Sequence, residues 1–211
     1  MRLLELFCGT KSVSKAVGDI FTEVVSVDIV PEFQPTIITD ILEWDYKQWP
    51  PGYFSVIWAS PPCQEFSCLN FARPDKVPDL AKADSLVQKT LEIIEYFNPD
   101  AFFIENPQTG TLKSRPYMEG IPFLDFDYCQ FGYPYRKRTR FWTSVDGEDK
   151  LCGPDCSQKI GKRHKNAIGN STYQEFWTET GKRLEQRYSI PAGVIKKLFS
   201  YLPSPSSAPS S

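Results

Sequence analysis

A thiol and a carboxylate in this sequence each follow a short apolar run, and together they could carry out covalent chemistry. Cys63 lies in the hexapeptide 59–64, ASPPCQ, directly after the apolar run 54–58. Glu105 lies 42 residues further on, directly after the apolar run 101–104. A thiolate is a strong nucleophile, and a nearby carboxyl group can give or take a proton. This pairing favours a catalytic cysteine over the alternative of a small residue that fills the core.

Strands and helices are expected to alternate through the first half of the chain. Apolar runs predict strands at 3–7, 24–27, 36–39, 56–59 and 101–104, and apolar residues at helical spacing predict helices at 11–17 and 79–97. This order indicates an α/β fold with a Rossmann-like, doubly wound and mostly parallel sheet. Ligands of such sheets bind outside the carboxyl ends of the strands, which is where Cys63 and Glu105 would meet.

The alternation stops after about residue 108. The elements expected beyond it are antiparallel strands at 124–130 and 140–144, a loop at 145–170, helices at 174–186 and 190–202, and a disordered Pro/Ser/Ala-rich tail at 203–211. A chain of 211 residues has room for a sizeable core, and one domain is the default.

Composition and charge limit the class of protein and its partners. No apolar stretch approaches the roughly 18 residues of a membrane helix, and the start does not resemble a signal peptide. Six cysteines without a secretion signal indicate a reducing compartment, so we expect an intracellular protein, cytoplasmic or nuclear, without a membrane partner. Residues 1–129 hold 10 basic and 19 acidic side chains, whereas residues 130–187 hold 12 and 7. The basic segment favours contact with a polyanion, and an unevenly charged solvated surface is the alternative.

Four short segments carry a resemblance to a known family. They are LFCGT at 6–10, PPCQ at 61–64, EN at 105–106 and RKRTR at 136–140, and they occur in the family's order. On these segments the sequence resembles the cytosine-C5 DNA methyltransferases, in particular the small members found in phages and large DNA viruses. The resemblance implies the fold of S-adenosylmethionine-dependent methyltransferases and an enzyme that transfers a methyl group from S-adenosylmethionine to C5 of a flipped-out cytosine in DNA.

The resemblance also implies roles for four catalytic side chains. Cys63 would attack C6 of the cytosine and form a covalent adduct, which makes C5 nucleophilic. Glu105 would hydrogen-bond N3 and the amino group of the base. Arg138 and Arg140 would steady the O2 atom and the adduct.

Ten residues would bind the methyl donor if the resemblance holds. Gly9 would let the backbone approach the methionine part, Asp28 would accept from the ribose hydroxyls, and Asp40 would accept from the adenine amino group. Helix or turn capping is the alternative role of both aspartates. Lys11 departs from the family, which usually has a second glycine there, and it could reach the donor carboxylate. The full set is Phe7, Gly9, Thr10, Ser12, Asp28, Ile29, Asp40, Ile41, Pro62 and Ser189.

The resemblance divides the chain into four parts. Residues 1–142 would form the cofactor-binding and catalytic core, 143–187 a small basic recognition insert, 188–202 a helix that returns to the core, and 203–211 the tail. An insert this short can place few side chains in a groove, so we expect short or relaxed sequence specificity, or a protein partner that supplies recognition surface. Four basic side chains of the insert would contact phosphates, namely Lys159, Lys162, Arg163 and Lys165. The alternative is that these side chains are only solvated.

Three cysteines and the single histidine could form a metal site. Cys152 and Cys156 are separated by three residues, and His164 follows eight residues after Cys156. With Cys129 they would supply three sulfur atoms and one nitrogen, a donor set typical of structural Zn²⁺. Metal binding would also stabilise a loop that is poor in apolar residues. The alternative is four residues without a common role.

Three other functions stay open beside DNA methylation. A branch of the family modifies tRNA, so the same chemistry could act on RNA. The fold could also belong to a catalytically silent protein that binds S-adenosylmethionine and nucleic acid, which Lys11 favours and the presence of Cys63 and Glu105 opposes. Cys63 could lastly act on a free nucleotide, although the basic segment argues against that.

Overall fold

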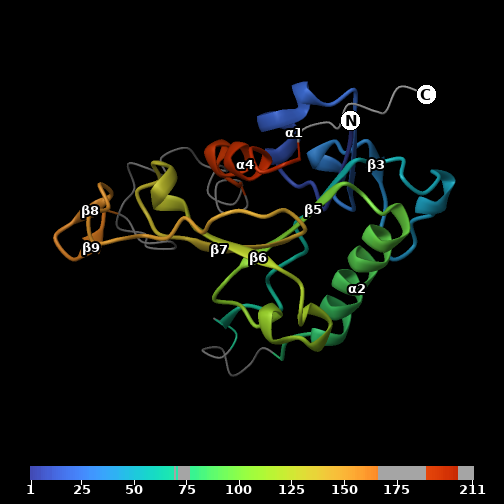
Figure 1. Ribbon diagram of the computed structural model, residues 1–211. Coiled ribbons are helices and arrows are strands. Elements are labelled where there is room, and N and C mark those ends of the chain that lie inside the picture. The colour runs from blue at the N-terminus through green and yellow to red at the C-terminus, as the bar shows by residue number, and fades with distance from the viewer. Residues whose placement is uncertain (69, 71–76, 166–188, 204–211) are drawn as a thin grey trace.

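The computed structural model describes residues 1–68, 70, 77–165 and 189–203, which form a seven-stranded sheet covered by helices (Figure 1). The strand order is β3-β2-β1-β4-β5-β7-β6. Neighbours from β3 to β5 pair in parallel, and β7 pairs antiparallel with β5 and β6. The predicted mostly parallel sheet with an antiparallel extension is therefore confirmed. The strands are β1 (Arg2–Leu6), β2 (Glu23–Asp28), β3 (Ile37–Ile38), β4 (Val56–Ala59), β5 (Ala101–Pro107), β6 (Phe123–Asp127) and β7 (Arg138–Thr143).

Helices cover both faces of the sheet, as in other doubly wound folds (Figure 1). On one face α1 (Ser12–Val17) and α4 (Ala192–Phe199) pack together, and on the other lies α2 (Leu80–Phe97). Leu3 and Leu4 of β1 belong to the two different cores because successive strand residues point to opposite faces. The short 3₁₀ helices are η1 (Gly18–Ile20), η2 (Pro31–Phe33), η3 (Tyr46–Gln48), η5 (Leu112–Ser114), η6 (Pro116–Met118) and η7 (Tyr128–Phe131).

A buried carboxylate in β1 caps the first helix. Glu5 is 2% exposed, and its two carboxylate oxygens accept hydrogen bonds from the backbone N–H groups of Val13 and Ser14, each at 3.2 Å. Lys11, at the N-cap position, has a left-handed backbone (φ 57°) and makes no side-chain cap, so Glu5 supplies the missing acceptor. Burial raises the pKa of Glu5, and its bonds to Ser14 and Val13 oppose that rise.

Capping residues fix both ends of α2. The Asp79 side chain accepts from the Lys82 N–H at 3.0 Å, and Asn98 ends the helix in the left-handed conformation at φ 46°. The helix buries one face against the sheet, formed by Ala83, Val87, Thr90, Ile93, Ile94 and Phe97. Its first turn therefore lies at a fixed place beside the loop that follows β4.

The predicted elements lie within three residues of the observed bounds through most of the described chain, and the differences fall in the second half. The helix expected at 190–202 spans only Ala192–Phe199, because Pro191 stands at its N-cap with an extended backbone. The loop expected at 145–170 contains a hairpin of two short strands, β8 (Lys159–Ile160) and β9 (Arg163–His164). The helix expected at 174–186, and the tail after Pro203, lie outside the described residues. Among the described helices none is long and apolar enough to cross a membrane.

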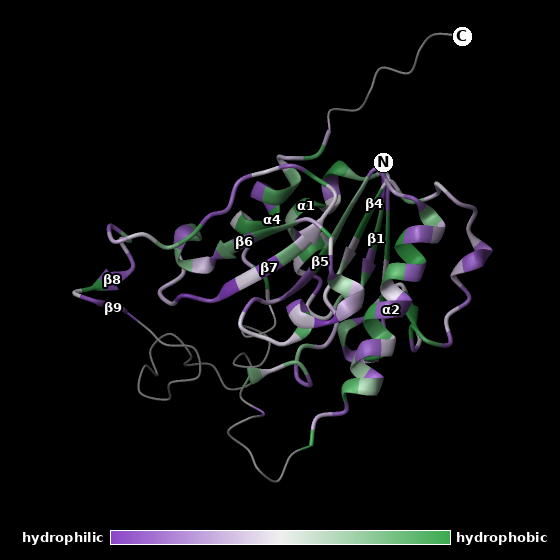
Figure 2. Ribbon diagram, turned by 60° about the horizontal axis from the view of Figure 1, so that its bottom comes forward, coloured by the Kyte–Doolittle hydropathy of each residue, from purple (hydrophilic) through white to green (hydrophobic). Residues whose placement is uncertain are grey.

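The β8–β9 hairpin stands apart from the sheet. In Figures 1 and 2 it lies at the outer end of the molecule, beyond β6 and β7. Most of the hairpin is hydrophilic, but β8 carries a hydrophobic residue (Figure 2), Ile160, which is 72% exposed.

Candidate active site and metal cluster

Two neighbouring parallel strands bring Cys63 and Glu105 to the same edge of the sheet. In the pairing of β4 with β5, Ala59 lies opposite Ile104. The loop that carries Cys63 leaves β4 directly after this pair, and Glu105 is the next residue of β5. The charge of Glu105 raises the pKa of the Cys63 thiol, so the two groups lie close enough to interact electrostatically.

The side chain of Asn106 holds the loop that carries Cys63. Its amide donates a hydrogen bond to the carbonyl oxygen of Pro61 at 3.0 Å, two residues before the thiol. Asn106 is fully buried, so the bond is made away from water, and its loss would leave a carbonyl without a partner. The position of the thiol therefore depends on β5 as well as on β4.

Glu105 is a buried acid with an oxygen that the fold does not use. The residue is 8% exposed, and its Oε1 atom has no hydrogen-bond partner among the described residues. Burial raises the pKa of Glu105, while Lys137 and the Ser60 hydroxyl act in the opposite direction. The raised pKa favours the neutral carboxyl group, which can donate a hydrogen bond to a ligand.

Cys63 is a free and partly buried thiol. Burial raises its pKa, and the Glu105 carboxylate raises it further by repulsion between like charges. Lys137 lowers the pKa of Cys63. A protonated Glu105 no longer repels the thiolate, so the neutral acid and the lysine together reduce the cost of forming the nucleophile.

Lys137 and Tyr128 complete this group, and the sequence did not indicate either of them. The Lys137 Nζ atom lies 5.0 Å from the centroid of the Tyr128 ring, and the Lys137 carbonyl accepts a hydrogen bond from the Tyr128 N–H at 3.2 Å. Tyr128 is fully buried, and the charges of Glu105 and Cys63 add to the rise that burial causes in its pKa. A lysine at this position has no distinctive sequence signal, because only the strand register shows which side it faces.

The structure does not bring Arg138 and Arg140 to the Glu105 side of the sheet. Residues paired across antiparallel strands share a face, and Glu105 pairs with Phe141, one position away from Arg140. Both arginines therefore project from the opposite face. There they form two-pronged ion pairs, Arg138 with Asp127 at 2.7 and 3.1 Å and Arg140 with Asp125 at 2.8 Å twice.

A cavity of about 470 Å³ lies beside Cys63, at the carboxyl ends of the strands. Pro62 and Gln64, which flank the cysteine, form part of its wall. Six of the ten residues predicted to bind a cofactor line it, namely Phe7, Asp28, Ile29, Asp40, Ile41 and Pro62. The first turns of α2 form a wall that the sequence did not indicate, with Asp79, Lys82, Ala83 and Leu86. The sequence predicted a helix at 79–97, but not that its first turns lie beside the cavity.

Both cavity aspartates also shape the backbone around them. Asp28 accepts from the N–H groups of Gly9 and Val30, each at 2.9 Å. Asp40 accepts from the Leu42 N–H at 3.0 Å, which is a turn cap. Each carboxylate oxygen has a second lone pair, so capping leaves acceptors for a ligand. Capping and ligand binding are therefore compatible roles for the two residues.

The loop after β1 uses three left-handed residues to bend its backbone towards the cavity. They are Phe7, Gly9 and Lys11, with φ of 54°, 45° and 57°. A side chain at Gly9 would meet no atom closer than 4.0 Å, so glycine is favoured there by its φ and not by lack of space. The Lys11 ammonium donates to the carbonyl of Gln34, a contact the sequence did not indicate.

The other predicted cofactor residues join the two ends of the chain. The Ser12 hydroxyl accepts from the N–H of Ile190 at 3.1 Å and lies 3.0 Å from the Thr10 hydroxyl. Ser189 precedes Ile190, so this bond brings the segment before α4 to the loop after β1. Gly9, Thr10, Ser12 and Ser189 do not line the cavity. The bond from Ile190 to Ser12 supports its first loop.

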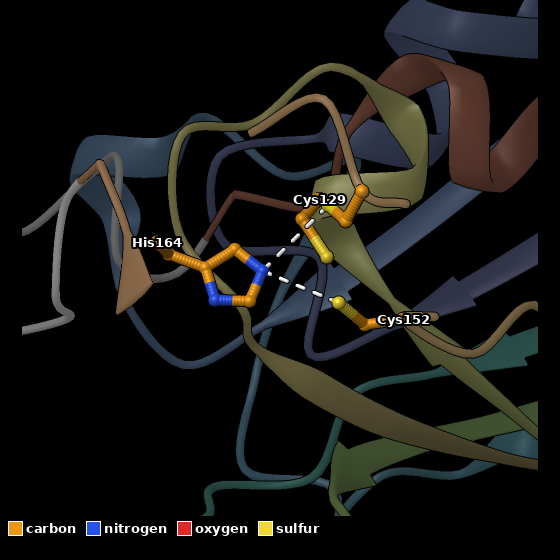
Figure 3. A group of neighbouring side chains, drawn as sticks. Cys129, Cys152 and His164 are labelled. Atoms are coloured by element: carbon orange, nitrogen blue, oxygen red, sulfur yellow. Dashed lines mark hydrogen bonds between the residues drawn. The ribbon is translucent and has the colours of Figure 1, made fainter. Parts of the chain in front are cut away.

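Cys129, Cys152, Cys156 and His164 form a cluster. Their candidate ligand atoms all lie within 4.8 Å of one another, and in Figure 3 the labelled side chains point towards a common centre. The His164 Nε2 atom lies 3.3 Å from the Cys152 sulfur and 3.7 Å from the Cys156 sulfur. Burial and the neighbouring thiols raise the pKa of Cys129 to about 12. Three sulfur atoms and one imidazole match the donors of tetrahedral zinc sites.

An aspartate links this cluster to the sheet. The Asp127 carboxylate accepts from the backbone N–H of Cys152 at 2.8 Å and also holds the Arg138 guanidinium. Cys129 lies in η7, directly after Tyr128. The cluster therefore lies at the same edge of the sheet as Cys63, next to the residues that surround the thiol.

Comparison with known proteins gives matches of sequence and of fold. A family model described as C-5 cytosine-specific DNA methylase matches residues 1–113. A probable DNA (cytosine-5)-methyltransferase of Frog virus 3 (isolate Goorha) is 35% identical over 217 residues, which covers 94% of this chain and 99% of that protein.

The fold is similar to that of solved methyltransferases. The S. pombe Dnmt2 methyltransferase matches with a TM-score of 0.52 and 15% identity, over 84% of this chain and 65% of that one. The Entamoeba histolytica methyltransferase EhMeth matches with a TM-score of 0.51 and 15% identity, over 80% of this chain and 58% of that one. A putative DNA modification methyltransferase encoded within an E. coli prophage matches with a TM-score of 0.52 and 16% identity, over 73% of this chain and 52% of that one. This chain thus spans about half to two thirds of the length of these structures.

Proposed function

Because the chain belongs to the family of C-5 cytosine-specific DNA methylases, we propose that it methylates C5 of cytosine in DNA through a covalent adduct on Cys63. The observation that carries the proposal is the buried Glu105 beside the Cys63 thiol, with its Oε1 unpartnered among the described residues. A buried acid with a free oxygen serves no purpose in the fold, whereas a flipped-out base would satisfy it.

The proposed reaction uses both side chains in turn. The Cys63 sulfur forms a bond to C6 of the ring, and the ring electrons move towards C5 while N3 takes a hydrogen bond or a proton from Glu105. C5 then forms a bond to the methyl carbon of the donor, while the bond from that carbon to the sulfonium sulfur breaks and the neutral thioether leaves. Loss of the C5 proton returns the electron pair to the ring, the bond from sulfur to C6 breaks, and Cys63 leaves as a thiolate.

Lys137 would provide the positive charge that the resemblance assigned to arginines. It lies on the Glu105 side of the sheet, over the Tyr128 ring, whereas Arg138 and Arg140 are held on the other side by carboxylates. Charge that builds on the pyrimidine during thiol attack would be stabilised by an ammonium group at this place. Lys137 also stabilises the thiolate before attack.

The cavity beside Cys63 fits S-adenosylmethionine, which supplies the methyl group when it is bound. Its volume is within the ~300–1,000 Å³ of ordinary ligand pockets, and most of its wall is apolar. Asp28 and Asp40 provide the acceptors that the hydroxyl and amino groups of an adenosine need. Ile41, 4% exposed, offers a flat apolar contact for the ring. The binding loop itself is supported by the contact between Thr10 and Ser12 and by the bond from Ile190 to Ser12.

The cysteine–histidine cluster would hold one structural Zn²⁺. The donor set and the closeness of the four side chains support this assignment. Bound zinc would cross-link η7, the 152–156 loop and β9, a region with few buried apolar residues. It would act on stability and not on the methylated base.

Transfer of label from S-adenosylmethionine tests the function. The full chain is incubated with duplex DNA, single-stranded DNA and tRNA, and Cys63→Ala is compared with Cys68→Ala, which removes an exposed thiol. We expect label on cytosines of DNA, lost in Cys63→Ala and kept in Cys68→Ala. Duplex DNA that contains 5-fluorocytosine should trap the adduct, because fluorine cannot leave C5 as a proton does.

Two results would contradict the proposal, and a third would add a partner to it. Label on tRNA alone would assign the chemistry to RNA. Cofactor binding without transfer or trapping on any substrate, even after addition of cell extract, would indicate a silent binding protein. Activity that appears only with the extract would show that a protein partner supplies the recognition surface. In each case the Cys68→Ala control separates these results from misfolding.

A further inference from the structure

The β8–β9 hairpin has one face that points inward and one that points away from the protein. In its antiparallel register Lys159 pairs with His164, and Ile160 pairs with Arg163. Paired side chains share a face, and neighbours along a strand alternate. His164 belongs to the metal cluster, and the Lys159 ammonium donates to the carbonyl of Gly153 at 2.7 Å. Ile160 and Arg163 therefore project from the outer face.

The outer face combines an apolar side chain with two cations. Ile160 is 72% exposed, and both Lys162 in the turn and Arg163 beside it are exposed. Gly161 makes the tight turn with φ 61°. An isoleucine this exposed contributes little to the stability of the fold, and at a projecting tip it is accessible to another molecule.

The hairpin is anchored at the edge where the base would enter. His164 contacts the sulfur atoms of Cys152 and Cys156, and the Cys152 N–H is bound by Asp127 at the end of β6. Cys129, the fourth member of the cluster, directly follows Tyr128, which lies beside Glu105. A duplex that presents a cytosine to Cys63 would therefore lie at the edge of the sheet to which the hairpin is anchored.

We propose that the hairpin tip, residues 160–163, enters a groove of duplex DNA, with Ile160 against the base edges and with Lys162 and Arg163 on the flanking phosphates. The choice of DNA rests on the proposed function. A two-stranded ribbon fits the major groove, where an apolar side chain can contact the thymine methyl group. The cations complement the phosphates on either side. This refines the expectation of four phosphate contacts, because Lys159 is turned inward.

A protein is the alternative partner that could bind the exposed isoleucine. Charge favours DNA, because the segment 130–187 holds 12 basic and 7 acidic residues on a chain of net charge −2. The hairpin tip carries cations and no acid between Lys159 and Lys165. Phosphates on both sides of a groove match that arrangement, whereas an apolar protein interface would leave the two exposed cations without use.

Binding of a fluorescent duplex by the full metal-loaded chain tests the proposal. Anisotropy is measured from about 50 to 200 mM salt for the wild type, Ile160→Ser and the double variant Lys162→Gln/Arg163→Gln. We expect Ile160→Ser to weaken binding about tenfold with an unchanged salt slope. The double variant should reduce the slope by about 2, one unit for each phosphate contact.

A matched control and two readouts separate the possible outcomes. Ile38→Ser removes a side chain that is 58% exposed in β3, at the far edge of the sheet, and should leave binding unchanged. Equal affinity of Ile160→Ser and the wild type would overturn the proposal, as would equal losses in Ile160→Ser and Ile38→Ser. The binding measurement does not depend on methyl transfer. If the wild type fails to methylate DNA but Ile160→Ser still weakens binding, the role of the hairpin stands and the proposed function is wrong.

Discussion

The side-chain amide of Asn106 donates a hydrogen bond to the carbonyl oxygen of Pro61 at 3.0 Å, and this bond joins β5 to the loop that carries Cys63. Asn106→Leu keeps the volume but removes the donor. We expect unfolding to become easier by about 1–3 kcal/mol, because the carbonyl is left unpaired. The thiol would lose its fixed position, so kcat should fall by at least about tenfold. Urea unfolding and methyl-transfer kinetics measure the two effects.

The control for this variant is Gln48→Ala, whose exposed amide donates to the carbonyl of Asp45 at 2.8 Å. Gln48→Ala should change neither the free energy of unfolding nor kcat. A stability loss in Asn106→Leu with kcat unchanged would show that the bond supports the fold alone.

Replacement of Lys137 should change the reactivity of Cys63 before any substrate binds. Lys137 lowers the pKa of the thiol, so Lys137→Gln should move the pH profile of Cys63 alkylation by iodoacetamide to higher pH, and Lys137→Arg should restore it. The described groups that face the thiol are Glu105, Tyr128 and Lys137. The rate of alkylation is followed by mass spectrometry of the Cys63 peptide between about pH 6 and 10.

Lys47→Gln is the matched control, because Lys47 also lies over a tyrosine ring, 5.8 Å from that of Tyr46. It should leave the profile in place. An unchanged profile in Lys137→Gln would remove Lys137 from the site, whatever its effect on the rate of methyl transfer.

Glu105 should make the protein less stable as pH rises. Its native pKa is raised above the ordinary 4.5 by burial, so above about pH 4.5 the unfolded chain loses this proton more readily than the native one. The stability that the neutral acid provides is complete below that pH and is lost as pH rises towards the native pKa. Glu105→Gln carries no such proton, so its stability relative to the wild type should increase with pH, by at most about 1.4 kcal/mol per unit.

Urea unfolding at pH 5, 6 and 7 measures the difference, which we expect to be absent for the exposed Glu43→Gln. Glu5 remains in both proteins, so its own raised pKa cancels. A difference between Glu105→Gln and the wild type that stays constant with pH would contradict a raised native pKa.

Removal of metal should destabilise the chain. A chelator is expected to lower the Tm of the wild type by at least about 5 °C, because the cluster closes long loops in a region with few apolar contacts. Elemental analysis should find about one zinc per chain in the wild type and none in Cys152→Ser. Cys68→Ser, which removes an exposed thiol outside the cluster, should retain the metal. Absence of zinc from freshly purified wild type, together with a Tm insensitive to the chelator, would leave the cluster as free thiols.

The sequence predicted the parts of the site that depend on whole strands, and it failed where a single position decides. The strand at 56–59 has the observed bounds, and the apolar runs before Cys63 and Glu105 are long enough to be recognised. Successive side chains of the basic run 136–140 point to opposite faces of the sheet. A shift of one residue in the strand register therefore changes which of them share a face with Glu105. The pairing of Glu105 with Phe141 shows that Arg138 and Arg140 lie on the opposite face, whereas the charge of Lys137, just before β7, lowers the pKa of the thiol.

Two further features had no local signal. The strands β8 and β9 are two residues long, which is too short for any alternation to be recognised. The wall that α2 gives to the cavity depends on packing between segments far apart in the chain. The cysteine–histidine cluster, in contrast, was recognisable, because the Cys152 and Cys156 spacing points to a shared ion independently of the fold.

The bond from the Ile190 N–H to the Ser12 hydroxyl connects residues 178 positions apart and so has a consequence for how the chain folds during synthesis. The ribosome makes Ser12, in the loop after β1, 178 residues before its partner Ile190. Domains begin to fold while translation continues, at about 5–20 residues per second, so for at least several seconds this loop lacks its final support. A nascent chain stalled before Ile190 should therefore have a formed sheet and an unsettled first loop, and S-adenosylmethionine capture should begin only when α4 has left the exit tunnel.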